Sequence, residues 1–323
     1  MEEVQPAIIA HMSRILVSGS LAYDRIMNYG GLFADSILPD KANSINLSFQ
    51  VEDLSVEFGG TAGNIAYNLA LLGEHPDIIA TAGNDFARYK SHLLLAGIEA
   101  TTVRFVENDM TSSAYVFTDR EDNQIAAFHA GAGAQPYNSP VGIDGRAFAI
   151  VAPGCTEDMA TLPQSYRRQN FKYFFDPGQQ TTALSPEALK NGISGAQILF
   201  ASDYELGLIA MKTGWTEDVI MDNVPTLVVT FGAQGSRIRT RTGDAKVSAA
   251  TPAKVVDPTG AGDAYRAGFM KGILAGFSLE ACAKLGSVIA SYVVEVHGTQ
   301  NHKFTMEEVK QRHQQSYKEE LKL

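Results

Sequence analysis

The sequence has few cysteines and lacks any long apolar segment. Its 323 residues include two cysteines, Cys155 and Cys282, which lie far apart and form no C-x-x-C pair. This excludes a disulfide framework and a cysteine-based zinc cluster. No apolar run approaches the ~20 residues of a membrane-spanning helix, and residues 1–11 lack the basic and then apolar order of a signal peptide. We therefore expect a cytoplasmic protein without a membrane partner, and we interpret residues 1–12 as an N-terminal extension outside the fold.

Basic residues are scarce relative to acidic ones. The 26 Lys and Arg against 36 Asp and Glu give a formal net charge of −10. A general nucleic-acid binder needs a basic face to neutralise phosphates, so we expect no nucleic-acid partner. A small phosphorylated ligand is not excluded, because local groups determine its site and salt screens more distant charges over about 8 Å. The length suits two domains or one large α/β domain with an appendage.

Strand-like and helix-like segments alternate along most of the chain. Short apolar runs predict strands over residues 14–19, 77–83, 147–152, 172–176, 197–201 and 226–231. Segments with helical spacing or helical composition predict helices over residues 64–72, 85–96, 156–169, 186–191, 204–212, 261–275, 279–296 and 305–321. This alternation predicts an α/β fold with a mostly parallel central sheet and helices on both faces.

Two stretches interrupt this alternation. Residues 42–58 and 101–127 have strand-like composition without a helical period, and a turn-rich segment at 119–123 joins two of the runs. They predict a small antiparallel sheet beside the main sheet, formed by residues of about 25–58 and 101–129. The exposed strand edges of such a sheet would allow a homodimer through it, and a monomer is equally compatible with the sequence.

The most informative chemical pattern is VVDPTGAGDAY at residues 255–265. Its proline ends an extended segment, and its two glycines allow a tight turn that approaches a ligand closely. A helix follows, so the backbone of Gly260, Ala261 and Gly262 lies at a helix start, where phosphate or an oxyanion binds well. Asp263 in the first turn is either a helix cap or a base for a hydroxyl group that attacks a phosphate. The helix dipole is expected to lower the pKa of Asp263.

Two further segments carry polar residues at the ends of predicted elements. In EFGGTAGN, residues 57–64, paired glycines precede a helix; Gly60 allows close backbone approach, and Asn64 either caps the helix or contacts a ligand. In GSLAYD, residues 19–24, the chain follows the first predicted strand, at the edge where ligands of open α/β sheets bind. Asp24 in this segment either forms a turn or accepts hydrogen bonds from both hydroxyls of a vicinal diol with its two carboxylate oxygens.

Competing phosphate-binding and catalytic patterns are absent from the sequence. There is no G-x-x-x-x-G-K-[ST] segment, no G-x-G-x-x-G match at Gly19 or Gly260, and no G-x-S-x-G segment. These absences exclude a P-loop protein, a Rossmann dehydrogenase and an α/β-hydrolase.

The segments around residues 57–64 and 255–265 resemble the two signatures of the PfkB (ribokinase-like) family of carbohydrate and nucleoside kinases. The resemblance implies a three-layer α/β sandwich over residues 13–323, with the small sheet as a lid. It implies that Asp263 is the general base. It implies that the anion hole is formed by Gly260, Ala261 and Gly262. It assigns the binding of substrate hydroxyls to Ser20, Asp24, Gly60 and Asn64.

The resemblance extends to elements that bind ATP and a cation. Residues 230–235, TFGAQG, resemble the family's T-x-G-x-x-G element. This assigns nucleotide binding to Thr230, Gly232 and Gly235. The family's loop for a monovalent cation such as K⁺ corresponds to Asp257, Thr259 and Gly298, and this site remains an open alternative.

Residues 202–205, SDYE, resemble the family's N-x-x-E motif. The resemblance implies that Glu205 organises Mg²⁺ through water. Ser202 stands where the family has asparagine, so its contacts to the nucleotide are expected to be weaker or rearranged.

The resemblance covers almost the whole chain and is closest to bacterial adenosine kinases. The matching stretches are SGSLAYD, FADSILPDK, INLSF, FGGTAGNIAYNLALLG, NQIAAFHAGA, DPGQQ, GDAYRAG and HGTQNH. It implies that Gln179 and Gln180 lie near the nucleobase, where an amide can pair with the donor and acceptor edge of adenine. Base stacking requires an aromatic ring, and the lid segments contain three candidates, Phe49, Phe117 and Phe128.

We therefore expect an ATP-dependent kinase of purine salvage that phosphorylates the 5′-hydroxyl of adenosine and yields AMP and ADP. One alternative is a ribokinase-like kinase that phosphorylates a free sugar. The other, from a different class, is a non-catalytic nucleoside sensor on the same scaffold.

Overall fold

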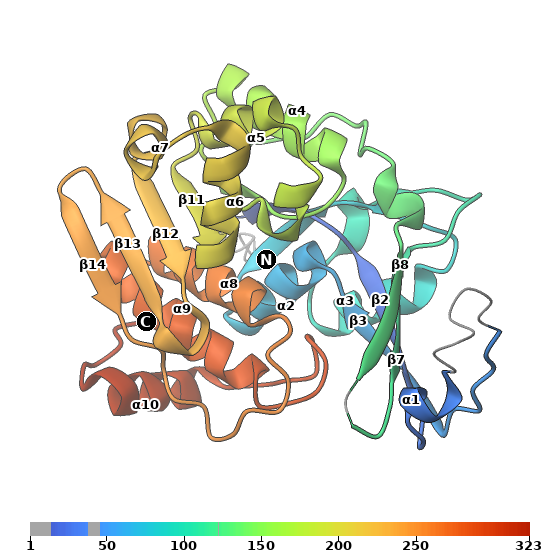
Figure 1. Cartoon of the computed structure of the whole chain (residues 1–323). Helices are drawn as coiled ribbons and strands as arrows, with labels where there is room; N and C mark the ends of the chain where they lie inside the picture. The colour runs from blue at the N-terminus through green and yellow to red at the C-terminus, as the bar shows by residue number, and fades with distance from the viewer. Residues whose placement is uncertain (1–13, 38–45, 122) are drawn as a thin grey trace, which may run out of the picture.

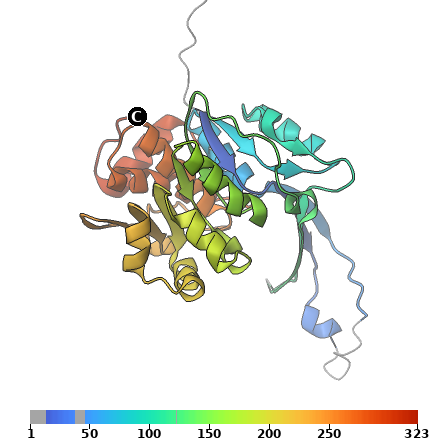
Figure 2. The same ribbon diagram turned by 90° about the horizontal axis from the view of Figure 1, so that it is seen from above.

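The described residues form two main β-sheets of different size and a separate pair of short strands. The computed structural model describes residues 14–37, 46–121 and 123–323, so the interpretation of residues 1–12 lies outside the described residues. The larger sheet is covered by helices, and the smaller sheet projects to one side of it (Figure 1, Figure 2). This arrangement confirms the predicted α/β fold. Within the described ranges, no helix is both long and apolar enough to cross a membrane.

Six of the eight strands that the described residues contribute to the larger sheet run parallel. In spatial order they are β14 (Gly243–Val247), β13 (Ser236–Thr240), β12 (Thr226–Thr230), β11 (Ile198–Ser202), β10 (Tyr173–Phe175), β9 (Arg146–Val151), β1 (Arg14–Ser18) and β4 (His75–Ile79). The strands from β12 to β4 pair in parallel, and β13 and β14 form an antiparallel hairpin at one edge. Ligands of such sheets bind at the edge where the parallel strands end.

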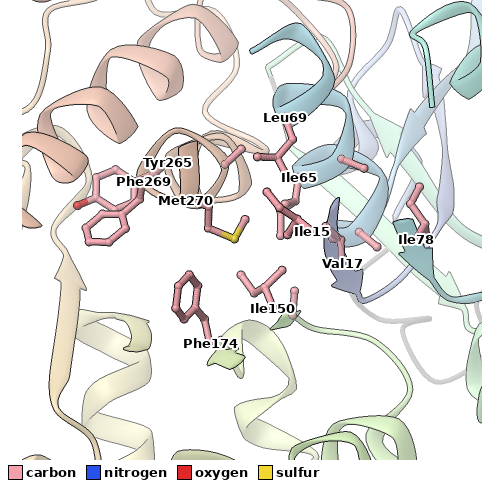
Figure 3. Close-up of a cluster of buried hydrophobic side chains, with 14 of the residues drawn as sticks. Ile15, Val17, Ile65, Leu69, Ile78, Ile150, Phe174, Tyr265, Phe269 and Met270 are labelled. Atoms are coloured by element: carbon pink, nitrogen blue, oxygen red, sulfur yellow. The ribbon is translucent and has the colours of Figure 1, made fainter. Parts of the chain in front are cut away.

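Helices cover both faces of the larger sheet. One face carries α2 (Thr61–Leu71), α3 (Ala87–Leu95), α8 (Ala261–Leu274) and α9 (Leu279–Val293), with α10 (Met306–Tyr317) packed on α9. The other face carries α4 (Thr156–Arg168), α5 (Pro186–Ile193), α6 (Asp203–Thr213) and α7 (Glu217–Asn223). Strand side chains alternate between the faces, so Ile15 joins the first core and Leu16 the second. Figure 3 shows the first core, where Leu69 of α2 and Met270 of α8 face the same side of the sheet as Ile15.

The smaller sheet has the strand order β3 (Asp53–Gly59), β2 (Ala22–Asn28), β7 (Ser112–Thr118) and β8 (Gln124–His129). The pairs β2–β3 and β7–β8 are antiparallel, as the sequence predicts, whereas the middle pair β2–β7 is parallel. Parallel pairing requires a long crossover, and α2, β4 and α3 lie between these two strands in the chain. Within the predicted extended stretch 42–58, residues 42–45 lie outside the described residues, residues 46–50 form no strand, and β3 confirms the extended structure near its end.

Some short elements differ from the prediction. The predicted strand over 77–83 divides into β4, in the larger sheet, and β5 (Thr81–Ala82). The strand β5 pairs with β6 (Arg104–Phe105), which was predicted to belong to the smaller sheet. A short helix, α1 (Phe33–Ser36), lies between β2 and β3. Single 3-10 turns occur at Ala100–Thr102, Gly131–Ala134, Gly178–Thr182 and Gly232–Gln234.

Candidate active site

The segments that the sequence singles out meet at the edge where β1 ends. The side chain of Asn64 on α2 donates from Nδ2 to Asp263 Oδ2 on α8 over 2.7 Å. The carbonyl of Ser20, just after β1, accepts a hydrogen bond from the Ala62 N–H at the start of α2. The two glycine-containing helix starts and the segment after β1 therefore form one site.

The turn before α8 requires glycine at position 260. Gly260 has a φ of +79°, and a Cβ there would come within 2.8 Å of Thr299 Cγ2. The first N–H groups of α8 lack acceptors within the helix, which makes this turn suitable for an anion. The Ala261 N–H donates to the Pro258 carbonyl over 3.2 Å, so an anion bound by Ala261 would have to replace that hydrogen bond.

Asp263 is the third residue of α8, and its surroundings raise its pKa. Burial raises the pKa of this carboxyl to about 7, and the negative charges of Asp176 and Glu205 act in the same direction. The hydrogen bond from Asn64 and the positive charge of Arg266 oppose the shift. The prediction that the helix dipole lowers this pKa is wrong, because it omits burial and the two acids that the fold brings near. A carboxylate with a pKa near 7 suits general base catalysis at neutral pH.

A buried ion pair beside Asp263 was not found by sequence reasoning. Arg266 Nε donates to Asp176 Oδ2 over 2.8 Å, and Arg266 Nη2 donates to Asp176 Oδ1 over 3.2 Å. Arg266 Nη1 also donates to the Gly262 carbonyl over 3.3 Å. The pair thereby ties the residue after β10 to the first turns of α8. The available signal was an arginine within an apolar helix, which requires a buried partner for its charge.

Asp24 lies on β2 near two other acids. It stands directly opposite Glu57 of β3, and a Cβ at Gly59 would overlap its Oδ2. Burial, together with the negative charges of Asp257 and Glu57, raises the pKa of Asp24 to about 6. Asp24 is therefore mostly ionised at pH 7, with two acceptor oxygens beside the start of α2.

Ser20 and Gly60 determine how α2 begins. Gly60 has a φ of +88°, and a Cβ there would lie 2.6 Å from the Ser20 carbonyl oxygen. Ser20 Oγ accepts a hydrogen bond from the Thr61 N–H over 3.1 Å. Both predicted substrate-binding residues thus lie in the site, and both also have a structural role at the helix start.

A cavity of about 460 Å³ opens in front of the turn before α8. Thr230, Gly232 and Gly235, which the sequence predicts to bind nucleotide, line one part of it. Ala261 and Gly262 line another part. The predicted nucleotide element and the predicted anion hole therefore face the same cavity.

Ser202 and Glu205 form a reciprocal cap at the start of α6. The Ser202 N–H donates to Glu205 Oε2 over 2.7 Å, and the Glu205 N–H donates to Ser202 Oγ over 3.2 Å. Ser202 is not among the residues that line the cavity. The capping box explains the spacing of these two residues structurally, and their roles toward nucleotide and Mg²⁺ stay predictions.

A glycine turn with a buried carboxylate beside it and a cavity in front of it suits phosphoryl transfer to a hydroxyl group. The model of the pfkB family carbohydrate kinases matches residues 12–305. The chain belongs to this family. As a PfkB-family protein it is a phosphotransferase, which confirms the resemblance described above.

Relatives of this PfkB-family kinase are similar over almost its whole length. It is 30% identical to the nucleoside kinase of Methanocaldococcus jannaschii, over 93% of this chain and 97% of that protein. The crystal structure of that archaeal member of the ribokinase family superposes with a TM-score of 0.85 and covers 94% of this chain and 99% of its own. The structure of the nucleoside kinase of Burkholderia thailandensis in complex with inosine superposes with a TM-score of 0.82 and 34% sequence identity. The match covers 95% of this chain and 99% of the Burkholderia chain. The Burkholderia protein has also been solved with ADP-inosine. The ribokinase-like fold is therefore confirmed.

The predicted nucleobase residues of this PfkB-family kinase occupy the 3-10 turn after β10. Gln179 is exposed, and Gln180 Nε2 donates to the Gly154 carbonyl over 2.8 Å. A Cβ at Gly154 would come within 2.8 Å of the Gly19 backbone. The glutamine turn is thus connected through Gly154 to the segment that leads to Asp24.

The three candidate stacking rings have different surroundings. Phe49 packs on Tyr29 and Phe33, with ring centroids 4.8 and 5.3 Å apart. Phe117 on β7 is half-buried, and Phe128 on β8 is 63% exposed. Their role in stacking stays a prediction.

The cation loop predicted for this PfkB-family kinase is closed by hydrogen bonds. Asp257 Oδ1 accepts from the Thr259 N–H over 2.9 Å, and Oδ2 accepts from the Gly298 N–H over 3.2 Å. Burial alone would raise the pKa of Asp257, but these hydrogen bonds prevail and lower it. A K⁺ site in this loop stays a prediction.

Proposed function

We propose that this kinase transfers the γ-phosphoryl group of ATP to the 5′-hydroxyl of adenosine, which yields AMP and ADP. The observation that carries the proposal is the position of Asp263 in the first turn of α8, bonded to Asn64 and next to the cavity that Gly262 lines. The inosine complex of the Burkholderia relative supports a purine nucleoside as substrate. In a cell, this reaction would return purine nucleosides to the nucleotide pool, which is purine salvage.

The nucleoside would bind through its ribose at the start of α2. Asp24 would accept hydrogen bonds from the 2′- and 3′-hydroxyls, because its ionised carboxylate has two acceptor oxygens and lies beside Gly59. Ser20, Gly60 and Asn64 would complete the ribose site, and Gln179 and Gln180 would contact the base. This orientation would direct the 5′-hydroxyl toward Asp263.

The chemical step would transfer one proton and one phosphoryl group. The 5′-oxygen forms a bond to the γ-phosphorus while the bond from that phosphorus to the β–γ bridging oxygen breaks, and ADP leaves. Asp263 accepts the proton of the 5′-hydroxyl as the new bond forms. The backbone N–H groups of Gly260, Ala261 and Gly262 stabilise the negative charge on the transferred group. A loose transition state needs little early proton removal, so a base with a pKa near 7 is sufficient.

ATP would occupy the cavity between Thr230, Gly232, Gly235 and the turn before α8. Ser202 pairs with Thr230 in the neighbouring strand and would lie behind this element. Among the described residues, no group of three acidic, histidine or cysteine side chains is arranged to hold a metal ion. We propose that Mg²⁺ is held mainly by the phosphates and water, with Glu205 as an outer partner. When bound, Mg²⁺ neutralises phosphate charge.

We further propose that the smaller sheet acts as a lid. Asp24 lies on β2 of this sheet, so substrate binding would draw β2 and its neighbours toward α2. Closure would exclude water, which otherwise hydrolyses ATP. The domain division that we propose is therefore one kinase domain over residues 13–323 with lid segments at about 25–58 and 101–129.

The test is ATP-to-ADP turnover with Mg²⁺ for adenosine, inosine, guanosine, cytidine, ribose and fructose, with Asp263→Asn as control. We expect turnover with adenosine and a fall in kcat of about 10³-fold or more in the variant, since the variant loses the base. Turnover of ribose or fructose without any nucleoside would favour the sugar-kinase alternative. Wild-type turnover by Asp263→Asn would contradict the assignment of the base.

A further inference from the structure

A buried chain of hydrogen bonds leads away from Asp263. Asn64, which donates to Asp263, accepts at Oδ1 from Thr299 Oγ1 over 2.7 Å and from Gln300 Nε2 over 3.0 Å. Gln300 Nε2 also donates to Tyr89 Oη over 2.7 Å. The most exposed of Asn64, Thr299, Gln300 and Tyr89 is Asn64, at 4%. Bulk water therefore does not compete for these groups.

One backbone carbonyl determines the direction of the hydrogen bonds that lead from Tyr89 to Asp263. Tyr89 donates its only hydroxyl proton to the Gly59 carbonyl over 2.7 Å, because a carbonyl can only accept. Tyr89 must then accept from Gln300, so the NH₂ end of Gln300 faces it. The same NH₂ group faces Asn64, which therefore turns its oxygen toward Gln300 and its own NH₂ group toward Asp263.

Two further contacts reinforce this direction. The Thr299 hydroxyl lies 2.9 Å from the Phe58 carbonyl oxygen and 2.7 Å from Asn64 Oδ1. The Phe58 carbonyl can only accept, so Thr299 acts as the donor toward this pair of oxygens and its single proton is shared between them. Gln300 Oε1 lies 2.9 Å from His92 Nε2, and the His92 ring is stacked on Phe58 with centroids 4.0 Å apart. The oxygen end of Gln300 is thereby directed away from Asn64.

The glycine-rich segment of residues 57–64 leaves room for this series of hydrogen bonds. A Cβ at Gly63 would overlap Tyr89 Oη and come within 2.9 Å of Gln300 Nε2. Gly63 has no positive φ that would require glycine for backbone reasons. Its small size is needed for the approach of Tyr89 and Gln300 to Asn64.

We infer that Gln300 and Thr299 are positioning residues that fix the Asn64 amide so that it always donates to one oxygen of Asp263 and leaves the other oxygen to take the substrate proton. The inference rests on the proposed role of Asp263 as the base. It gives Asn64 a function toward the base in addition to its predicted contact with substrate. An amide turned the other way would present an oxygen to the carboxylate and oppose its ionisation.

The charged groups around Asp263 are Arg266 on the same helix, Asp176 after β10 and Glu205 on α6. Substitutions at 299 and 300 leave all three in place. A change in the ionisation of Asp263 in such variants therefore reports on the Asn64 amide.

The experiment follows the titration of Asp263 by ¹³C NMR of protein labelled at the aspartate carboxyl carbon. The signal is assigned by its absence in Asp263→Asn. In Gln300→Met and in Thr299→Val, the amide of Asn64 loses a donor, so we expect the pKa of Asp263 to rise by about one unit. The acid limb of kcat/KM should move to higher pH by the same amount, while the nucleoside Kd changes less than about twofold.

Two matched variants serve as controls. In Thr299→Ser, which keeps the hydroxyl, Asp263 should titrate as in the wild type. Gln314→Met makes the same change as Gln300→Met at an exposed position on α10.

If Gln300→Met does not fold, the Thr299→Val and Thr299→Ser pair decides the question. An unchanged Asp263 titration in Thr299→Val and Gln300→Met would overturn this inference. Turnover by Asp263→Asn would instead overturn the proposed function.

Discussion

Asp24 and Asp263 both have a raised pKa, but the charged groups around the two carboxyls differ. Around Asp263, burial has the largest effect, and the positive charge of Arg266 partly offsets the negative charges of two acids. Around Asp24, burial is reinforced by two acids, one of which is the cross-strand neighbour Glu57. The two carboxylates therefore have similar pKa values but different proposed roles. Asp263 has the pKa of a base, and Asp24 is an ionised acceptor at pH 7.

The raised pKa of Asp263 should reduce the stability of the folded protein as the pH rises. Between its unfolded pKa of about 3.9 and its folded value of about 7, the folded state binds more protons than the unfolded state. The contribution of Asp263 to the free energy of unfolding therefore falls by at most about 1.4 kcal/mol per pH unit in this window.

Asp263→Asn removes this titration and keeps the shape of the side chain. We expect the variant to gain stability relative to the wild type as the pH rises, with a larger difference at pH 8 than at pH 5. Urea unfolding at the two values measures the difference, and Asp53→Asn on the exposed end of β3 is the control. A difference that does not depend on pH would contradict the raised pKa.

Asp24→Asn should weaken nucleoside binding more than it slows the chemical step. Hydrogen bonds to a charged acceptor contribute about 1.5–3 kcal/mol each, so we expect KM for the nucleoside to rise about 10- to 100-fold. In the wild type, KM should also rise as the pH falls below about 6, because Asp24 becomes protonated. Steady-state kinetics from pH 5 to 8 measures both effects. An unchanged KM in the variant would exclude Asp24 from the ribose site.

At the scale of elements, the start of α6 combines a structural and a proposed chemical role. Ser202 and Glu205 cap the helix reciprocally, and α10 begins with the same motif in Thr305 and Glu308. Glutamine preserves a capping box, so Glu205→Gln separates the two roles. We expect Glu205→Gln to keep its stability but to need more Mg²⁺ for half-maximal turnover.

The variants at the two caps distinguish these contributions. Ser202→Ala should lower the free energy of unfolding by about 1 kcal/mol without changing the Mg²⁺ requirement. Glu308→Gln makes the same chemical change as Glu205→Gln at a remote helix start and should leave the Mg²⁺ requirement unchanged. Equal Mg²⁺ requirements in the wild type and Glu205→Gln would assign Glu205 a capping role alone.

The sequence predicted best those elements whose local pattern agrees with their tertiary surroundings. The strands of the parallel sheet are buried on both faces and therefore appear as continuous apolar runs, as in β9 and β11. The strand β13 was missed because its sequence, SRIRT, is polar. Its Arg237 and Arg239 are neutralised by Glu217 at the start of α7, with N–O distances of 2.7 and 2.6 Å. Such a contact arises only in the folded protein.

The candidate site shows the same difference between features with a local sequence pattern and features that depend on tertiary contacts. The positions of Gly260, Asp263 and Asn64 could be predicted because a glycine turn before a helix has a local sequence pattern. The pKa of Asp263, the Arg266–Asp176 pair and the partners of Asn64 could not, because they depend on residues far away in the chain. Local sequence therefore predicted which groups would lie together but not how they are oriented and charged, and their chemical roles stay predictions.

At the scale of the whole molecule, the two sheets should differ in local stability. The strands β1 and β9 are largely buried between two layers of helices, whereas every residue of β8 is exposed. Amides of β1, β9 and β10 should therefore exchange hydrogen most slowly and those of β8 much faster. Hydrogen exchange followed by mass spectrometry measures this order.

Substrate should change this pattern if the smaller sheet closes as a lid. Saturating nucleoside should slow exchange in β2, β3, β7 and β8 and leave β10 and β11 nearly unchanged. The Asp24→Asn variant at the same nucleoside concentration serves as the weak-binding control. Equal exchange of the lid strands with and without nucleoside would show that they do not close.

The parallel pairing of β2 with β7 also bears on the order of folding. The hairpin of β7 and β8 is local, but Ala22 of β2 pairs with Ser112 of β7 across a loop that contains α2, β4 and α3. Closing that loop costs less entropy once those elements have packed on the main sheet. We therefore expect the two halves of the smaller sheet to join late, after the main sheet has formed. A nucleoside held between the two sheets would then stabilise contacts absent from the folding transition state, and would slow unfolding more than it accelerates refolding.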